Sequence, residues 1–180
     1  MELTSENIYI RFYEKTDAQA LFELRLRNAE FFQKYAPTFN EENYTLDAVL
    51  KYIRNAPKQR KEDKQYAFGI FLKDENKLIG EVSLSHISRG SLQRGLIGYS
   101  LDKQYNGKGY TTEAVCLAVR FAFDELKMHR IEAGVMLSNI GSMRVLEKAG
   151  FQREGIEKKG VKINGRWEDH QIFAKISDKD

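Results

Sequence analysis

Cysteine and histidine are scarce in this sequence. The 180 residues contain one cysteine, Cys116, which excludes an intramolecular disulfide framework. The three histidines, His86, His129 and His170, do not lie at metal-ligand spacing from one another. We therefore expect a reduced protein without a metal site.

Signals for secretion, membrane insertion and nucleic-acid binding are also missing. Residues 1–12 have no basic segment followed by an apolar run, so we expect no signal peptide. The most apolar helical stretch, 114–123, is interrupted by Arg120 and is far too short to span a bilayer. The net charge, 29 − 26 = +3, is too small to indicate nucleic acid as a partner. We expect a soluble cytoplasmic protein with no membrane partner and no direct nucleic-acid partner.

What is present fits one globular domain. Hydrophobic residues make up 42% of the chain and charged residues 31%, which is too apolar for a disordered protein. A length of 180 residues suits a single core. The sequence contains no repeat or linker, so we expect one domain over 1–180 with its core in 8–176.

Alternating and helical apolar periods divide the chain into elements. Strands are expected at 7–13, 66–73, 78–87, 94–102, 130–136, 152–163 and 166–176. Helices are expected after Asp17, with Ala20, Leu21 and Leu24 inward, and over 45–62, 108–126 and 140–149. Pro57 should end or bend the second helix, and Asn164-Gly165 predicts a hairpin. The order predicts an α/β (α+β) fold with a mixed, mostly antiparallel seven-stranded sheet and about four helices.

The most informative segment is 101–112, LDKQYNGKGYTT, where a strand ends and a helix begins. N–H groups in the first turn of a helix have no intrahelical acceptor, and the helix dipole favours an anion there. Gly107 and Gly109 permit unusual backbone angles and the close approach of a phosphate, and Lys108 adds positive charge. We interpret the segment as a diphosphate-binding loop. The alternative is a helix entry turn that needs glycine for its backbone alone.

Two other phosphate-binding motifs do not match. The P-loop string G-x-x-x-x-G-K-S/T does not occur in the sequence. A dinucleotide-binding fingerprint would need a third glycine where Thr112 stands, and a βαβ unit that begins with this strand. Three strands precede the segment instead, so both motifs fail on residues and on position.

The spacing Gln104-x-x-Gly107-x-Gly109 resembles the acyl-CoA pyrophosphate motif of the GNAT N-acetyltransferase superfamily. Downstream, the family's second cofactor segment is similar to NIGS at 139–142, VLEKAGF at 145–151 and EG at 154–155. The RimJ/RimL branch, and RimJ-type ribosomal-protein-alanine N-acetyltransferases most of all, resemble IGYS at 97–100, HR at 129–130 and NGRWEDH at 164–170. The similarity covers about 8–176 as a fold, and its specific motifs lie in 95–173.

The resemblance implies a GNAT-type domain whose sheet splays apart at an acetyl-CoA site, between the strands at 94–102 and 130–136. Pantetheine would fill the gap like an extra strand along the backbone of Tyr99 and Leu101. The N–H groups of 107–112 would bind the pyrophosphate, Asn139 would hydrogen-bond the pantetheine arm, and Gln104 would shape the loop or contact a phosphate. The expected cofactor-binding residues are Tyr99, Leu101, Gln104, Gly107, Lys108, Gly109, Tyr110, Thr111, Thr112, Asn139 and Ser142.

The implied reaction is direct attack of an amine on acetyl-CoA, with no metal. The backbone N–H near Tyr99 would stabilise the tetrahedral oxyanion, and Ser142 would give the departing thiolate a proton or a hydrogen bond. Ser142 also suits the third position of a helix capped by Asn139. Glu81 is the best carboxylate for a base if its strand turns it toward the cleft; the alternative is a solvent-facing glutamate. Some RimL relatives have a glutamate at the position aligned with Val161, so that role is not carried over.

Other conspicuous residues receive structural or open assignments. Cys116 is expected to pack in the core or within its helix, Glu113 to interact with the helix dipole or organise the loop, and Glu154 to be a structural acid. His170 is substrate-side or structural. The aromatic residues of 31–44, which are Phe31, Phe32, Tyr35, Phe39 and Tyr44, line an acceptor site or pack beside the core.

Three functions of the protein are considered, which differ in the acceptor of the acetyl group. An α-amine, with a reference pKa of ~7.7–8.0, needs less help from a base than a lysine amine at ~10.4, and a water chain could take its proton. The first function is therefore acetylation of a protein N-terminus, ribosomal by the resemblance. The alternatives are acetylation of a small amine (a polyamine, amino acid or antibiotic) and a low-turnover acetyl-CoA-binding or ribosome-assembly module. The protein is expected to be a monomer or homodimer.

Overall fold

The computed structural model describes residues 1–37 and 44–178. The strands are β1 Glu2–Thr4, β2 Ile8–Phe12, β3 Gln65–Leu72, β4 Lys77–Ser88, β5 Arg94–Leu101, β6 Arg130–Met136, β7 Gln152–Ile163 and β8 Arg166–Ile176. The helices are η1 Lys15–Asp17, α1 Ala18–Arg27, α2 Ala29–Gln33, α3 Leu46–Lys61, η3 Lys103–Tyr105, α4 Tyr110–Asp124 and α5 Ile140–Lys148. The strands form one sheet in the order β1-β2-β3-β4-β5-β6-β8-β7.

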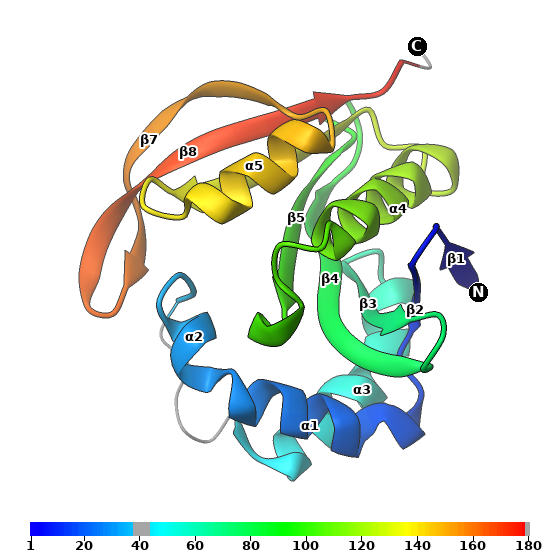
Figure 1. Ribbon diagram of the computed structural model, residues 1–180. Coiled ribbons are helices and arrows are strands. Elements are labelled where there is room, and N and C mark those ends of the chain that lie inside the picture. The colour runs from blue at the N-terminus through cyan, green and yellow to red at the C-terminus, as the bar shows by residue number, and fades with distance from the viewer. Residues whose placement is uncertain (38–43, 179–180) are drawn as a thin grey trace.

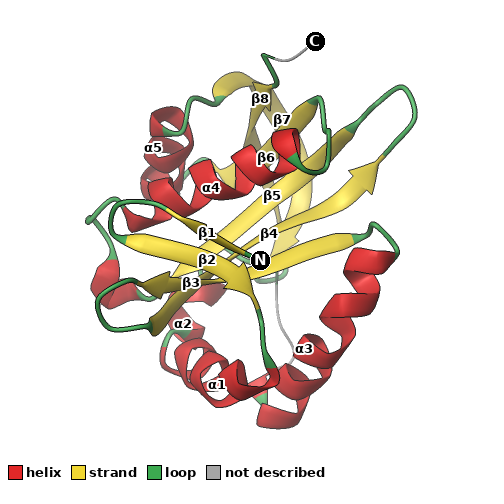
Figure 2. Cartoon of the chain, turned by 90° about the vertical axis from the view of Figure 1, so that its right-hand side faces the viewer, coloured by secondary structure: helices red, strands yellow, loops and turns green. Residues whose placement is uncertain are grey.

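Helices cover both faces of the central sheet (Figure 2). Helices α4 and α5 pack on one face, where the largest core cluster includes Phe68, Val115 and Phe173. Helices α1 and α3 pack on the other face, over Phe71. Since successive side chains of a strand point to opposite faces, β3 is buried on both sides and reads as a continuous apolar run.

The expected α/β fold with a mixed, mostly antiparallel sheet is confirmed, but the element counts were too low. The described residues contain an eighth strand, β1, and a fifth α-helix, α2. Strand β1 has three residues and α2 has five, so neither is long enough to show an apolar period. Both form because tertiary neighbours supply the partners, as β2 does for β1.

Two local expectations about helices need comment. Ala20 is exposed, and Ala18 is buried in its place, so the inward assignment of Ala20 is wrong. Pro57 does not end helix α3, which continues to Lys61, close to the expected end at 62. Pro57 lies on the exposed side, while the Arg60 guanidinium packs 4.0 Å from the centroid of the Phe12 ring. We attribute the continued helix to this packing, which offsets the hydrogen bond that proline cannot donate.

The sheet splays apart where the family resemblance places the cofactor. Strands β5 and β6 are the parallel pair, and their register joins Arg94–Leu96 to Arg130–Glu132. Beyond Leu96 no further pairing between β5 and β6 occurs within the described residues, although both strands continue. In Figure 1, α5 and the β7–β8 hairpin lie on one side of this divergence, and α1 and α2 lie on the other. The divergence therefore opens the middle of the sheet.

Candidate active site

A cavity of about 740 Å³ occupies the divergence of β5 and β6. This volume is in the range that small-molecule ligands and cofactors require. Its walls come from α2, from β5 over 97–101, from the loop and first turn of α4, from β6 over 133–136, and from α5. Nine of the expected cofactor residues line it: Tyr99, Leu101, Gly107, Gly109, Tyr110, Thr111, Thr112, Asn139 and Ser142. The other two, Gln104 and Lys108, are not among the described lining residues.

The loop before α4 presents backbone to this cavity. Gly107 and Gly109 have φ angles of 81° and 86°, and Gly109 is the N-cap of α4 without a side-chain cap. A Cβ at either glycine would meet no described heavy atom within 4 Å. The first hydrogen bond back into the helix runs from Glu113 N to Gly109 O at 3.1 Å, so the N–H groups of 110–112 have no intrahelical acceptor. Open space, free donors and the helix dipole together suit a phosphate.

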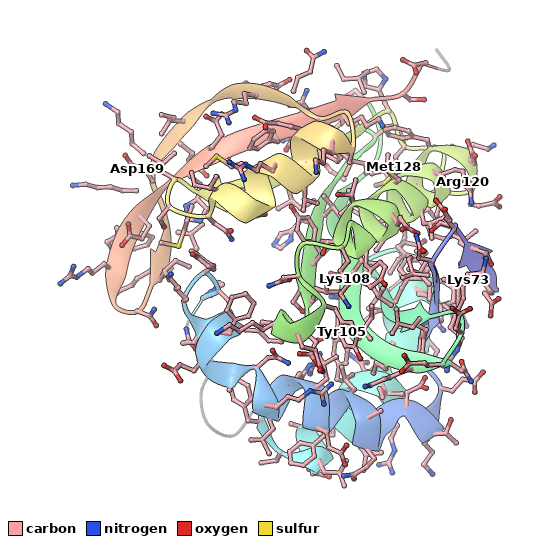
Figure 3. The ribbon with its side chains drawn as sticks, in the orientation of Figure 1. Lys73, Tyr105, Lys108, Arg120, Met128 and Asp169 are labelled. Atoms are coloured by element: carbon pink, nitrogen blue, oxygen red, sulfur yellow. The ribbon has the colours of Figure 1, made fainter. Side chains whose placement is uncertain are left out.

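Lys108 and Gln104 flank the loop. The Lys108 Nζ lies 5.5 Å from the centroid of the Tyr105 ring, and both side chains are labelled in Figure 3. Gln104 Nε2 donates to Asp102 Oδ2 at 3.0 Å. Of the two roles open to Gln104, the structure therefore supports the shaping of the loop.

Asp102 joins this loop to the α1–α2 corner. Its carboxylate is almost completely buried and accepts from Arg27 Nε at 2.8 Å as well as from Gln104. Beside it, Lys103 N donates to Asn28 Oδ1 at 3.0 Å. Burial opposes the charge of Asp102, but the hydrogen bonds from Gln104, Arg27 and Asn28 outweigh it and hold the pKa of Asp102 below its ordinary value. The loop and the first helices are thus held together by a buried charge.

Tyr99 and Ser142 meet across the cavity wall. The Tyr99 hydroxyl lies 2.8 Å from Ser142 Oγ, which brings β5 and the first turn of α5 together. Asn139 caps α5 by accepting from Ser142 N at 3.2 Å, as its position in the sequence predicts. Burial raises the pKa of Tyr99 to about 12, against the opposing effect of the hydrogen bond to Ser142. The phenol therefore stays protonated at neutral pH.

Glu81 is not brought to the cavity. It is absent from the described lining residues, and its carboxylate lies on the α1 face of the sheet. Arg25 donates to it through Nη2 at 2.7 Å and Nε at 2.9 Å, and Tyr13 donates at 3.0 Å. Its cross-strand neighbour Ser100 does line the cavity. Glu81 therefore shares a face with a lining residue, as its strand predicts, but Arg25 of α1 pairs with its carboxylate.

Aromatic side chains of α2 and the turn after it close one end of the cavity. Phe31, Phe32 and Tyr35 are half-buried and line it, as one of the two alternatives for this segment predicted. Phe39 lies outside the described residues. The tip of the β7–β8 hairpin holds α2 from the far side: Gln33 Nε2 donates to Asn164 Oδ1 at 3.1 Å, and Asn164 Nδ2 donates to Gln33 O at 3.1 Å.

The remaining residues singled out from the sequence lie elsewhere. Glu113 anchors the N-terminal segment by accepting from Asn7 Nδ2 at 2.7 Å and from the Ser5 hydroxyl, and Glu154 pairs with Arg130. Burial of Glu113 is outweighed by these hydrogen bonds, which lower its pKa. His170 is buried with its Nδ1 3.1 Å from Glu168 O, which supports its structural alternative. Cys116 is exposed on α4, so of its two alternatives the packing in the core is wrong.

Sequence reasoning assigned the α5 segment to the cofactor site but did not name all of its lining residues. Besides Asn139 and Ser142, Gly141, Arg144, Val145 and Lys148 line the cavity from α5. Their spacing of i, i+3, i+4 and i+7 defines one face of a helix, so the signal was present once Ser142 was assigned to the site. This face supplies the cavity with two exposed cations, Arg144 and Lys148.

Other site types find no support in the described chain. No group of three or more His, Cys, Asp or Glu residues within 1–37 and 44–178 could hold a metal ion. None of the helices in these residues is long and apolar enough to cross a membrane.

Known proteins share this fold and most of its length. The model of the acetyltransferase (GNAT) domain matches residues 7–152. The chain is 51% identical over 178 residues to the probable N-acetyltransferase YjcK of Bacillus subtilis, covering 99% of this chain and 98% of that protein. It is 29% identical over 174 residues to the ribosomal protein uS5-alanine N-acetyltransferase of Escherichia coli, covering 97% of this chain and 90% of that protein.

A solved structure agrees with these relatives. The ribosomal-protein-S5-alanine acetyltransferase from Vibrio fischeri superposes with a TM-score of 0.93 at 32% identity, and the match covers 99% of this chain and 98% of that one. The family model spans most of the chain, including the glycine loop and both walls of the splayed strands. This chain belongs to the GNAT family of N-acetyltransferases and is related to its ribosomal-protein acetyltransferases.

Proposed function

We propose that this protein transfers the acetyl group of acetyl-CoA to the α-amine of a protein N-terminus, and that the acceptor is a ribosomal protein. The observation that carries the proposal is the single cavity that is lined by the first turn of α4, by Ser142 and by the aromatic residues of α2. A donor with a diphosphate fits one end, and an acceptor chain can enter at the other.

The residues at the α4 end suit CoA. The N–H groups of 110–112 and the open space before Gly107 and Gly109 would hold the pyrophosphate. Beyond Leu96 the backbone of β5 has no β6 partner within the described chain, so its groups near Tyr99 and Leu101 can pair with pantetheine as a strand would. Asn139 would contact the same arm, although its side chain also caps α5.

The residues in the middle of the cavity suit the transfer itself. The Tyr99 backbone N–H, at the open edge of β5, would donate to the oxyanion, and Ser142 would donate to the sulfur that leaves. Glu81 is held by Arg25, so its role as a base stays a prediction. An α-amine at a reference pKa of ~7.7–8.0 is partly neutral near pH 7, and water can take its proton.

The acceptor class is supported by two points. The E. coli and V. fischeri relatives are named for the alanine of a ribosomal protein, S5. The wall at α2 is built from Phe31, Phe32 and Tyr35, whose apolar rings suit a peptide better than a polyamine. No carboxylate is among the described residues that line the cavity, whereas a polyamine site would need one.

The test mixes purified protein and acetyl-CoA with a panel of N-terminal peptides and small amines, and follows free CoA. We expect release with peptides, those from ribosomal proteins above all, and little with polyamines or amino acids. Release with small amines alone would assign the alternative acceptor class. Binding of acetyl-CoA without release for any acceptor would assign the low-turnover binding module.

A further inference from the structure

The hydroxyl of Tyr99 has two possible acceptors, both on Ser142. Its oxygen lies 2.8 Å from Ser142 Oγ and 3.3 Å from Ser142 O. Hydrogen bonds between two oxygens are strongest at about 2.7–2.8 Å and weaken beyond about 3.0 Å, so the contact with Oγ is the stronger of the two. The Tyr99 phenol and the Ser142 hydroxyl therefore form a hydrogen-bonded pair at the cavity wall.

The direction of this hydrogen bond follows from the chemistry of the two groups. Both hydroxyls keep their hydrogens at neutral pH, so either oxygen of this pair could donate. A phenol is the stronger donor and an aliphatic alcohol the better acceptor. We therefore assign Tyr99 as the donor to Ser142 Oγ, which leaves the hydrogen of Ser142 for a third atom. The Ser142 hydroxyl makes no other hydrogen bond with residues 1–37 and 44–178.

We propose that Tyr99 is a positioning residue: its phenol hydrogen bond turns the Ser142 hydroxyl into the cavity and makes it a stronger donor to the sulfur of CoA. This inference rests on the proposed function. Donors that themselves accept a hydrogen bond are strengthened, because the bonds in a chain polarise one another. The role belongs to the Tyr99 side chain and is separate from that of its backbone N–H.

When bound, acetyl-CoA supplies the acetyl group: a C–N bond forms, the C–S bond breaks with its electron pair left on sulfur, and the amine proton passes to water. Ser142 stabilises the sulfur by a hydrogen bond and keeps its proton. Tyr99 also keeps its proton, because its raised pKa opposes formation of a phenolate.

The Tyr99 hydroxyl is not needed for the stability of the fold around it. The N–H of Ser142 is already bound by the Asn139 cap, so α5 does not need the phenol to begin. The Tyr99 ring packs against the core cluster, which a phenylalanine ring would do equally well. What phenylalanine cannot supply is the hydrogen for Ser142 Oγ.

The first experiment needs no acceptor. The acidity of the thiol of bound CoA is titrated by the ultraviolet absorption of its thiolate, in wild type, Tyr99→Phe, Ser142→Ala and the double variant. We expect the acid dissociation constant of the bound thiol to fall about tenfold in Ser142→Ala and about threefold in Tyr99→Phe, since a donor to sulfur stabilises the thiolate. Arg144 and Lys148, the charged residues among those described as lining the cavity, are the same in every variant.

The second experiment measures turnover with the best acceptor. We expect Tyr99→Phe to lower kcat about fivefold at unchanged KM for acetyl-CoA, and to have no further effect in Ser142→Ala. Tyr66→Phe is the matched control, because its hydroxyl donates at 2.8 Å to Asp63 outside the cavity, and it should change neither constant.

The outcomes separate the inference from the function on which it rests. The positioning role would be overturned by an unchanged acid dissociation constant of the bound thiol in Tyr99→Phe. It would also be overturned if the losses of kcat in the two single variants multiplied in the double variant. In either case the binding of CoA would stand. Failure of the wild-type protein to bind CoA would overturn the proposed function, and the inference with it.

Discussion

The two ends of the cavity are built in different ways. The α4 end consists of backbone from one continuous segment, 101–112, in which two glycines leave space and a helix supplies N–H donors. The α2 end consists of side chains, and it is held by Gln33 and Asn164, which are far apart in the sequence. A backbone site leaves a short motif in the sequence, whereas a side-chain wall leaves only scattered aromatic residues. The difference predicts that lesions at the two ends affect different substrates.

The largest effect is expected at the backbone end. Gly107→Asp should weaken CoA binding about a hundredfold, since it places a carboxylate in the open space before the helix and adds strain at a left-handed φ. Calorimetric titration with CoA measures this. Gly90→Asp is the matched control, because Gly90 also has a positive φ of 67° and open space but lies outside the cavity. Equal affinity of Gly107→Asp and the wild-type protein for CoA would refute the diphosphate-binding role of the loop.

The next largest effect is expected for Glu81, whose carboxylate lines neither end of the cavity. Glu81→Gln should lower the free energy of unfolding by about 2 kcal/mol, because it leaves Arg25 without its charged partner in a mostly buried pair. We expect kcat to stay within about threefold of wild type, since Glu81 does not line the cavity. Denaturant titration and steady-state kinetics measure the two quantities. Glu154→Gln, in a more exposed pair with Arg130, is the control for stability. A hundredfold fall in kcat for Glu81→Gln would instead assign Glu81 as the general base.

A substitution at the α2 end should affect the acceptor and not CoA, which is the opposite of what we expect for Gly107→Asp. Phe31→Ala should raise KM for the peptide acceptor about tenfold, by loss of apolar contact, and leave the affinity for CoA unchanged. Leu26→Ala, at an exposed apolar residue of α1, is the matched control. Weaker CoA binding in the Phe31 variant would show that the two ends are not separate.

The smallest effect is expected at the joint between the two ends. The pKa of Asp102 is lowered in the folded protein, so its charge stabilises the fold above the ordinary value of ~3.9 and the contribution is lost as pH falls through the lower folded value. Asp102→Asn should therefore cost about 1 kcal/mol at pH 7 and less at pH 3, measured by urea titration. Asp47→Asn, at the fully exposed Lys51 pair, should change nothing at either pH.

Much of the fold was predictable because its elements carry their own periods. Strands β3, β4 and β5 and helix α4 bury regular apolar faces, and the Asn164-Gly165 turn has the positive φ angles that its residues favour. Helix α2 and strand β1 were missed because each is too short for a period. The pairing of Glu81 was not predictable, because alternation along a strand tells which face a side chain takes, but not that Arg25 of a distant helix meets it there.

The sequence by itself determined the loop at the start of α4, the alternating elements around it and the family to which they belong. These depend on neighbours within a few residues, where glycine angles, helix ends and apolar periods act. The tertiary structure decided which side chains share the cavity: Tyr99 with Ser142, the α5 cations with the glycine loop, and α2 with the hairpin tip. Such pairs depend on how far β5 and β6 diverge, which is a property of the packed sheet and of no single segment.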